Sequence, residues 1–435
     1  MSTGAALPSG QGDGESVQAR NETTCCVVGG GPGGVMLALL LARNGVPVTL
    51  LEAHPTFDRD FRGDTVHPAI LEILDEIGLA DRLHELPHVK MYGPTFPTAD
   101  GPVMVFDFRR LLKTRFPYIM WMAQPIFLQF LAEEAKKFPS FTLVLGANVQ
   151  GLIEEAGAVR GVRYRTADGW QEVRALLTVG ADGRFSRVRK LGGFRAIQTS
   201  SPVELLWFHL PRLAGDPEGT GIVSPRFGKG HVLIMIDRAD HWQVGYFFPA
   251  GNYQKLHTAG VEAMRRNIVS LEPRFAENVK SLTDWHQFTL LSVASSRCPR
   301  WYKPGLLLIG DAAHTMTPAA GSGIKYAIED AVVAANLLTG PLLAKRVHVR
   351  DLAEVQRRRE WPTRAIQALG AFGLKNLGRF LVSRRAFRNE SGAGNSPPFP
   401  RWVTWLFRLP FLPWLFARML AFGIWRVHVE KPRGK

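Results

Sequence analysis

A glycine-rich turn near the start of the chain is the clearest place where residue types and spacing predict chemistry. Gly29-Gly30-Gly31-Pro32-Gly33-Gly34 fits the pattern G-x-G-x-x-G and follows a short apolar run, Thr23 to Val28. Between a strand and a helix, the first glycine permits a tight turn, the second lets backbone amides approach a pyrophosphate, and the third allows close packing. The positive end of the helix then faces the phosphates. We therefore predict dinucleotide binding by Gly29, Gly31, Pro32, Gly33 and Gly34.

An acidic residue stands where the ribose of such a nucleotide would lie. Glu52 follows the next apolar run, Pro47 to Leu51, eighteen residues after Gly34. A carboxylate there accepts hydrogen bonds from both ribose hydroxyls, which favours an adenosine without a 2′-phosphate. The alternative is a glycine-rich turn that binds nothing, and the register of strand, helix and acid weighs against it. This motif alone does not separate NAD from FAD.

A second acid favours FAD. The apolar run Gly305 to Ile309 delivers Asp311 just beyond its carboxyl end, in Gly310-Asp311-Ala312-Ala313-His314. Ligands of α/β sheets bind beyond such strand ends. An aspartate there can accept from ribityl hydroxyls, and the loop Thr317 to Gly323 leads into a predicted helix whose first amides can face the flavin pyrimidine. That helix terminus would stabilise the charge of a reduced flavin.

Three motifs together resemble those of the para-hydroxybenzoate hydroxylase-like flavoprotein monooxygenases, over residues 23 to 340. They are the glycine turn with Glu52, Asp182-Gly183, and Gly310-Asp311. The resemblance implies FAD as cofactor and NADPH or NADH as transient reductant. It further implies O2 as the oxygen source for hydroxylation or epoxidation of a hydrophobic, aromatic substrate. It associates Asp182 and Gly183 with FAD and nicotinamide binding, whereas an isolated Asp-Gly pair is an ordinary turn.

The resemblance also nominates further cofactor contacts. It places an arginine beside the flavin and pyrophosphate, for which Arg62 is the candidate, and it matches Gln124 to a flavin-contacting position, with a polar helix cap as the alternative. The remaining positions of the predicted cofactor site are Ala53, Val149, Pro318, Gly321, Gly323 and Ile324. No catalytic acid or base is nominated, because His67, His209 and His314 are each interpreted as structural. No metal site is expected.

One position departs from the family pattern. The loop into the last helix of the nucleotide-binding unit normally carries Asn two residues after its second glycine, and this chain has Lys325. A cation there either stabilises the reduced flavin or points to solvent. The departure keeps a catalytically silent flavin-binding module as an alternative function. A second alternative is an FAD-dependent reductase of isoprenoid or quinone-like lipids, and the absence of a Trp-x-Trp-x-Ile-Pro element disfavours a halogenase.

These motifs require a parallel sheet with flanking helices. A strand over Thr23 to Val28, a helix over Val35 to Arg43 and a strand over Pro47 to Leu51 form one βαβ unit. A helix over Pro125 to Phe138, a strand over Phe141 to Leu145 and a three-stranded meander within residues 149–179 extend it. We expect an α/β fold: a Rossmann-like FAD-binding domain with a parallel sheet plus β-meander, an inserted β-rich substrate domain and a helical C-terminal segment.

The expected division of the chain follows these elements. It comprises a disordered tail over 1–22, an FAD-binding domain over 23–88, 124–195 and 296–340, a substrate domain over 89–123 and 196–295, and a basic, aromatic helical region over 341–435. The substrate domain has predicted strands over Glu204 to Leu210, His231 to Asp237 and Trp242 to Phe248, and Gly323 to Leu338 is a predicted helix. The tail lacks a secretory apolar stretch and three cysteines imply no disulfide framework, so a cytoplasmic protein is expected.

The end of the chain is basic and aromatic. The net charge is +15, and residues 341–435 hold 19 Lys and Arg against 5 Asp and Glu. Nucleic acid is not an expected partner, because no stacking motif, zinc spacing or basic recognition helix accompanies the charge. Nine aromatic residues between Phe399 and Trp425 are interleaved with three arginines and interrupted by Pro410 and Pro413. The pattern is typical of an interfacial helix on an anionic membrane; the alternative is a lid packed on the substrate domain or a second subunit.

Overall fold

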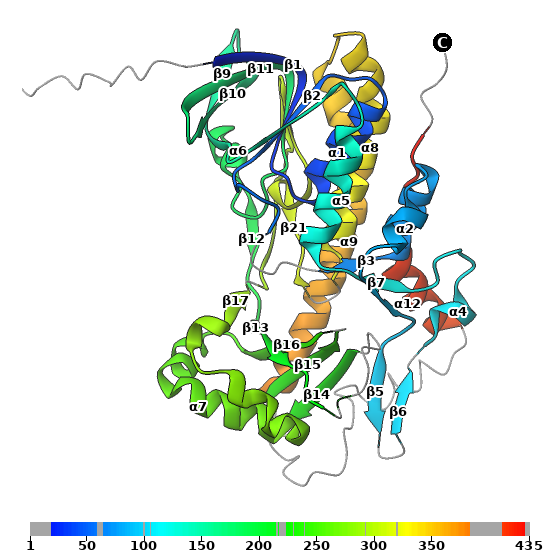
Figure 1. Ribbon diagram of the computed structural model, residues 1–435, viewed down its shortest axis with the longest axis vertical. Coiled ribbons are helices and arrows are strands. Elements are labelled where there is room, and N and C mark those ends of the chain that lie inside the picture. The colour runs from blue at the N-terminus through cyan, green and yellow to red at the C-terminus, as the bar shows by residue number, and fades with distance from the viewer. Residues whose placement is uncertain are drawn as a thin grey trace, which may run out of the picture.

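The computed structural model describes residues 19–430, except 59–63, 99–100, 105, 215, 217–222, 229, 239, 292, 319–320 and 383–410. Figure 1 shows a large mixed sheet with a bundle of long helices beside it, and a second sheet with its own helix at the far end of the molecule. Short helices and strands form a third group at one side of these two units.

The main sheet has eight strands. Six follow the order β19-β20-β11-β1-β2-β8, and β10 and β9 extend from β11. Their bounds are β1 Ala19–Val28, β2 Val48–Glu52, β8 Phe141–Leu145, β9 Asn148–Glu155, β10 Ala158–Thr166, β11 Gly169–Gly180, β19 Tyr302–Lys303 and β20 Leu306–Leu308. β1 pairs in parallel with β11 and β2, whereas β9, β10 and β11 pair antiparallel. The expected parallel sheet with an added meander is confirmed.

Helices cover this sheet, which explains why its central strands are apolar. The last four residues of β1, Cys25 to Val28, are buried, as is all of β2. Strands enclosed on both faces need no polar side of their own. α1 (Pro32–Arg43), α5 (Gln124–Lys136) and α8 (Gly323–Leu343) lie close together beside the sheet (Figure 1). Their buried residues and those of the sheet form the largest core of the protein.

The second sheet has five antiparallel strands in the order β14-β15-β16-β13-β17. Their bounds are β13 Val203–Pro211, β14 Val223–Gly228, β15 His231–Asp237, β16 His241–Pro249 and β17 Thr289–Leu291. One face packs on α7 (Tyr253–Leu271), a helix that the interpretation of this stretch as β-rich missed. Of its nineteen residues only Met264 and Ile268 are buried, so its apolar periodicity is weak.

Three small sheets and several short helices connect the two units. The sheets are β3 Thr65–Val66 with β7 Ile119–Trp121 and β4 Val89–Met91; β5 Thr95–Thr98 with β6 Gly101–Met104; and β12 Ile197–Thr199 with β18 Ser295–Arg297 and β21 His314–Thr315. The short helices are α2 Pro68–Glu76, α3 Ala80–His84, α4 Phe108–Leu111 and α6 Arg187–Leu191, and the 3-10 turns are η1 Pro273–Ala276, η2 Asn278–Ser281, η3 Trp285–Gln287 and η4 Gly310–Ala312.

The C-terminal region contributes two helices. α9 (Val349–Leu381) runs from the main-sheet helices to the second sheet (Figure 1). Leu352 and Val355, near its start, lie in the main core, and Leu374 and Leu381, near its end, pack beside the second sheet. α12 (Phe411–Phe422) packs beside α2 and α4. Within the described residues, no helix combines the length and the apolar character needed to cross a membrane.

One boundary corrects an expectation. β1 begins at Ala19, so residues 19–22, which were expected in a disordered tail, form part of a strand. They pair with Gln171 to Arg174 of β11, and Arg20 lies 3.6 Å from Glu172. The sequence did not indicate this extension, because it is polar and charged, and only the later half of β1 is buried.

Candidate functional site

The carboxyl ends of three neighbouring strands bring the three sequence motifs to one edge of the main sheet. β1 ends at Val28, which pairs with Gly180 of β11, and Gly180 pairs with Leu308 of β20. The glycine turn, the Asp-Gly pair and the Gly-Asp pair each follow directly after these ends. This is the edge at which α/β sheets bind ligands.

Three glycines of the turn are required by packing between elements. A Cβ at Gly29, whose φ is +108°, would lie 2.5 Å from the carbonyl oxygen of Ala181. A Cβ at Gly34 would collide with the carbonyl oxygen of Gly29, and one at Gly33 would lie 2.9 Å from the carbonyl oxygen of Ala327 in α8. The turn is therefore pressed between β11 and α8, where no larger residue fits.

Gly31 differs from these three. A Cβ there would meet only the carbonyl oxygen of Ala181, at 4.0 Å, apart from its own neighbours along the chain. Gly31 is the N-cap of α1, and neither a capping side chain nor an acid in the first turn satisfies the helix terminus within the described chain. No side chain of the described chain caps the start of α1, an arrangement suited to an anion.

Glu52 lies beside this turn at the end of β2. The residue is 2% exposed, and its Oε2 accepts a hydrogen bond from the backbone N–H of Gly30 at 2.6 Å. Its Oε1 accepts from the backbone N–H of His54 at 2.9 Å and lies 2.6 Å from His54 Nδ1. These contacts fix the orientation of the carboxylate next to the glycine turn, and Ala53 follows it at the surface.

The Asp182 carboxylate is directed at the start of α6. Its Oδ1 accepts from the Ser186 hydroxyl at 2.5 Å and its Oδ2 from the backbone N–H of Val188 at 2.9 Å. Burial raises the pKa of Asp182, and these hydrogen bonds oppose that rise. Gly183 has a φ of +79°, as the turn requires. The structure thus gives Asp182 the role of a helix cap as well as a place at the motif edge.

The Gly310-Asp311 pair is held from behind by α8. The backbone N–H of Gly310 donates to Asp330 Oδ2 at 2.9 Å, and His314 Nε2 lies 2.6 Å from the same oxygen. Asp311 itself is partly exposed at the strand end. Arg189, from the Asp182 segment, donates to the carbonyl oxygen of Ala312 at 3.0 Å. Arg189 therefore ties the second motif to the third through the carbonyl oxygens of Asp311 and Ala312.

Arg359 of α9 completes this buried network. It is 1% exposed and donates to Asp330 Oδ1 and Glu329 Oε2, both at 2.7 Å. Burial alone would raise the pKa of Asp330, but the charges of His314 and Arg359 outweigh it and keep that pKa low. Sequence reasoning missed Asp330 and Arg359. The available signal was the acidic pair Glu329-Asp330 inside an otherwise apolar, Ala-rich helix.

The loop before α8 is anchored to the segment around β3. The carbonyl oxygen of Gly321, whose φ is +58°, accepts from the Thr65 hydroxyl at 2.8 Å and faces His67 Nε2 at 3.1 Å. α8 then begins at Gly323 without a capping side chain or an acid in its first turn, among the residues described. A Cβ at Gly323 would meet nothing within 4 Å. A second uncapped helix terminus therefore lies at the same edge of the sheet.

Lys325 does not point to solvent, so that alternative for its side chain is wrong. Its side chain is 1% exposed, and its Nζ donates to the carbonyl oxygens of Leu420 at 3.1 Å and Met419 at 3.4 Å. His67 Nδ1 also faces Leu420, at 2.9 Å. Burial lowers the pKa of Lys325 to about 8. The departure from the family pattern thus has a structural reason: the amine caps the carboxyl end of α12.

The other predicted positions are placed as follows. Gln124 is the first residue of α5, and its backbone N–H donates to Asp64 Oδ1 at 3.3 Å. Val149 is buried in the main core, Ile324 lies buried in the first turn of α8, and Pro318 is partly buried in the preceding loop. Arg62 lies outside the described residues. As expected, His67 and His314 are buried within the scaffold; His209 faces His241, with ring centroids 4.4 Å apart.

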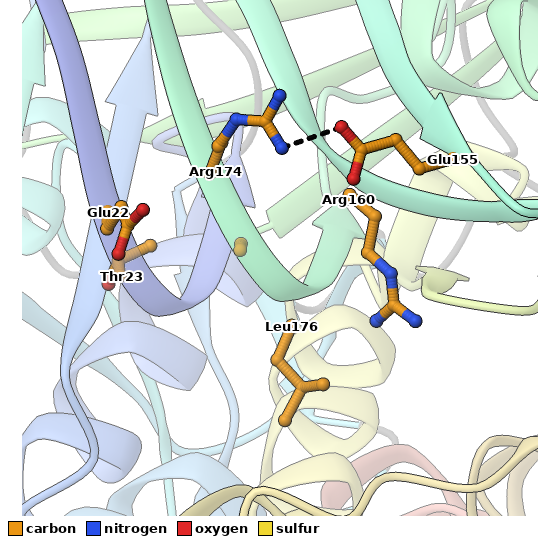
Figure 2. Close-up of a pocket in the computed structure, with 7 residues that line it drawn as sticks. Glu22, Thr23, Glu155, Arg160, Arg174 and Leu176 are labelled. Carbon is orange, nitrogen blue, oxygen red and sulfur yellow. Dashed lines mark hydrogen bonds and ion pairs between the residues drawn. The ribbon is translucent and has the colours of Figure 1, made fainter.

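Two cavities lie in the described part of the chain, and the first is remote from the motif edge. Figure 2 shows the first, lined by charged side chains that include the Arg174–Glu155 pair at 2.7 Å. It also touches Glu22 in the first half of β1, roughly 20 Å along the strand from Gly29, so it is separate from the motifs. The second, of about 350 Å³, is lined by hydroxyl side chains that include Thr317 and by Leu374 and Lys375 of α9. It borders the loop before α8.

Comparison with known sequences places the chain among FAD-binding proteins. Residues 22–367 match a family described as FAD binding domain. The chain is 34% identical over 337 residues to 6-methylpretetramide 4-monooxygenase of Streptomyces rimosus, covering 76% of this chain and 78% of that protein. It is also 28% identical over 328 residues to the ubiquinone hydroxylase UbiL of Rhodospirillum rubrum, covering 70% of each.

Solved structures with the same fold extend this comparison. PqsL of P. aeruginosa, in complex with 2-aminobenzoylacetate, superposes with a TM-score of 0.70 at 22% identity and covers 83% of this chain and 99% of its own. The anhydrotetracycline hydroxylase OxyS of Streptomyces rimosus has a TM-score of 0.70 at 22% identity, with 92% of this chain and 76% of that one covered. At this identity the likeness establishes the fold.

Proposed function

The chain belongs to the family of FAD-dependent aromatic hydroxylases, and from that premise we propose that it uses NADPH or NADH and O2 to hydroxylate or epoxidise a hydrophobic aromatic compound. One observation carries the assignment to this particular chain. The glycine turn, the Asp182-Gly183 pair, Gly310-Asp311 and the loop before α8 meet along one sheet edge, as an extended dinucleotide requires.

The residues at one end of this edge fit the adenosine and pyrophosphate half of FAD. Gly31 leaves open the space in front of α1, whose uncapped N–H groups would donate to the phosphate oxygens. Glu52, held rigidly beside the turn, would accept from the ribose hydroxyls. Asp182 and Gly183 would line the opposite side, with the backbone rather than the capping carboxylate of Asp182 toward the cofactor.

The residues at the other end fit the ribityl and flavin half. Asp311 would accept from ribityl hydroxyls, and the uncapped start of α8 at Gly323 and Ile324 would face the flavin pyrimidine. When bound, FAD supplies the two-electron chemistry that activates O2, which no protein side chain can provide. The protein's part is to bind, to orient and to exclude water. Lys325 is engaged with α12, so in this proposal it stabilises the fold around the flavin rather than the flavin itself.

The relatives support the substrate class. Their names describe monooxygenation of 6-methylpretetramide and hydroxylation of ubiquinone. A nicotinamide would act as a transient reductant from solution, since the sequence has one glycine fingerprint only. We propose that the substrate binds between the loop before α8 and the inner face of the second sheet, the face opposite α7.

The test is a labelled turnover by the purified protein. The protein, incubated with FAD and freed of excess, should be yellow and should oxidise NADPH or NADH faster when a suitable phenol or quinone is added. Under ¹⁸O2 the product should gain one labelled oxygen atom. A protein that stays colourless after incubation with FAD would disprove cofactor binding. Nicotinamide oxidation without ¹⁸O in any product would favour the reductase alternative.

We also propose that the C-terminal aromatic segment contacts an anionic membrane surface. The first half of α12 is exposed, with Phe411 at 58%, Trp414 at 45% and Leu415 at 44%, whereas Ala417, Ala421 and Phe422 are buried against the α4 and β7 region. The packed half fits the lid alternative, and the exposed half fits an interfacial anchor. The rest of the segment, residues 399–410, lies outside the described chain.

A further inference from the structure

A buried histidine connects the end of α12 to the residues just before α8. His67 lies between β3 and α2, is fully buried, and faces a backbone carbonyl oxygen with each of its ring nitrogens. Nδ1 lies 2.9 Å from the carbonyl oxygen of Leu420 in α12. Nε2 lies 3.1 Å from the carbonyl oxygen of Gly321, two residues before the start of α8. Two segments that are far apart in the sequence therefore meet at one side chain.

The ring has one proton for these two acceptors. Burial lowers the pKa of His67 to about 3, and the charge of Lys325 contributes to the same shift, so the imidazole is neutral near pH 7. A neutral imidazole has one N–H donor and one lone pair. His67 can therefore donate to Leu420 or to Gly321 but not to both at once, and its lone pair faces the other carbonyl oxygen.

Each of the two carbonyl oxygens has a second donor. The Thr65 hydroxyl donates to Gly321 at 2.8 Å, and Lys325 Nζ donates to Leu420 at 3.1 Å. Neither carbonyl is therefore unsatisfied when the imidazole proton is on the other side. The distance to Leu420 is the shorter of the two, which favours the proton on Nδ1 as long as α12 is in place. If Leu420 moves away, the contact with Gly321 becomes the better hydrogen bond.

The main chain fixes the position of the ring. His67 is the N-cap of α2, and its own carbonyl oxygen accepts from the backbone N–H of Ile70 at 2.9 Å. The two residues before it form β3, which pairs with β7. The imidazole makes no capping hydrogen bond to α2. Because the ring cannot follow both carbonyl oxygens, a movement of Leu420 changes the interaction of His67 with Gly321.

The end of α12 allows a close approach of α8. Gly423 follows the helix with a φ of +71°, and its backbone N–H donates to the carbonyl oxygen of Met419 at 2.8 Å. Glycine commonly ends helices in this left-handed conformation. A Cβ at Gly423 would lie 3.3 Å from the Tyr326 hydroxyl oxygen and 3.5 Å from Lys325 Nζ. The absence of a side chain at Gly423 thus lets the first turn of α8 pack against the helix end that carries Leu420.

We propose that His67 is a positioning residue, through which the end of α12 sets the position of Gly321 and of the start of α8 beside the flavin. The proposal rests on the proposed cofactor site, in which the start of α8 faces the flavin pyrimidine. With α12 in place, His67 donates to Leu420, and its Nε2 lone pair repels the carbonyl oxygen of Gly321. When the end of α12 is displaced, the Nδ1–H bond is replaced by an Nε2–H bond with no change of charge, and His67 draws Gly321 toward α2. The C-terminal helix thereby acts on the cofactor through one backbone carbonyl.

The first test displaces the end of α12 without a change in His67. Gly423→Ala adds a methyl group against the first turn of α8. Gly251→Ala is the matched control, because Gly251, between β16 and α7, has a φ of +83° and a Cβ there would meet nothing within 4 Å. Both variants carry the same backbone strain. Gly423→Ala should bind FAD roughly tenfold more weakly than wild type in a flavin titration, with shifted absorption bands of the bound flavin, and Gly251→Ala should match wild type in both.

The second test asks whether the effect passes through His67. His67→Leu removes both ring nitrogens and keeps a side chain of similar size, whereas His67→Gln keeps an amide donor for one carbonyl. His67→Leu should shift the flavin bands and weaken FAD binding as Gly423→Ala does, and His67→Gln should retain more of the wild-type behaviour. Gly423→Ala combined with His67→Leu should differ little from His67→Leu alone, since both changes act on one contact.

Each outcome decides the matter. A Gly423→Ala variant that matches Gly251→Ala in both readouts would overturn the proposal, as would additive effects in the double variant. If Gly423→Ala does not fold, the two His67 variants still decide. Variants that lose stability while their flavin bands stay those of wild type would leave His67 a structural role only, which contradicts this inference but not the proposed function. A wild-type protein that takes up no FAD would instead disprove the proposed function.

Discussion

The Asp330 carboxylate, in the middle of α8, accepts a hydrogen bond from the backbone N–H of Gly310 and so fixes the residue that precedes Asp311. The same carboxylate binds Arg359, which also binds Glu329. Two neighbouring acids thus share one guanidinium, but only one of them touches the motif. This asymmetry provides a matched pair of variants.

Asp330→Asn should weaken FAD binding more than Glu329→Gln does. Either change leaves Arg359 with one carboxylate in a buried place, so each should lower the free energy of unfolding by about 3 kcal/mol or more. Only Asp330→Asn also removes a charged acceptor from Gly310, and we expect about tenfold lower FAD affinity from it. Denaturant unfolding and flavin titration measure the two effects separately. Equal FAD affinities in the two variants would contradict the role given to Asp330.

Two glycines of the same turn should respond in opposite ways to alanine. At Gly31 a Cβ meets open space, so Gly31→Ala should fold with stability within about 1 kcal/mol of wild type. Its methyl group would occupy the approach to the pyrophosphate, and FAD affinity should fall by roughly a hundredfold. At Gly34 a Cβ collides with the backbone of Gly29, so Gly34→Ala should lose about 3 kcal/mol of stability or more.

The contrast within this pair would be measured by thermal unfolding of the apoprotein and by FAD titration. If Gly31→Ala binds FAD as tightly as wild type does, the pyrophosphate does not lie in front of Gly31 as proposed. A fully stable Gly34→Ala variant would show that Gly34 does not pack against the backbone of Gly29 as described.

Much of the fold followed from local patterns. β8 and β15 have the predicted bounds, and the motif-bearing strands β1, β11 and β20 are where their apolar runs indicated. Strand ends of a parallel sheet share one edge, so the meeting of three motifs could be inferred without coordinates. The cofactor contacts at that edge remain predictions.

What the sequence did not disclose depends on contacts between distant segments. Asp64 and Arg238 form a buried ion pair although they are 174 positions apart, and neither has a periodicity or a motif that marks it as buried. Lys325 was interpreted from its place beside the flavin loop, whereas its partners lie 94 and 95 residues later in α12. α7 escaped detection because a helix that covers one side of a sheet needs only a narrow apolar stripe.

Lys325 predicts a rise of stability at alkaline pH. Its pKa in the folded protein is about 8, below the ordinary 10.5. Below pH 8 the amine is charged in both states, and the cost of burying that charge is constant. Between about pH 8 and 10.5 the unfolded chain holds more protons than the folded one, so the folded state gains stability as pH rises. The full gain is about 3 kcal/mol.

This rise should vanish in Lys325→Met. Unfolding free energies of wild type and variant would be compared at pH 7, 9 and 10.5, with Lys375→Met, which removes an exposed lysine, as the control. The unfolding free energy of wild type should rise relative to that of Lys325→Met as the pH increases. The unfolding free energy of Lys375→Met should change with pH as that of wild type does. Parallel curves for Lys325→Met as well would show that the amine is not buried against α12.

Membrane contact by α12 is best tested by substitution rather than truncation, because removing the helix would also uncover the region packed against Ala417, Ala421 and Phe422. A Phe411→Ser, Trp414→Ser and Leu415→Ser triple variant changes only exposed side chains. Each apolar side chain of this size contributes roughly 1.5 to 3 kcal/mol when buried in an apolar phase. Wild type should float with vesicles of phosphatidylcholine and phosphatidylglycerol, less so with phosphatidylcholine alone, and the triple variant should stay in solution.

Phe372→Ser, which removes an aromatic residue 65% exposed on α9, serves as the control and should float like wild type. Equal flotation of the triple variant would assign the exposed half of α12 to another partner, such as a second subunit.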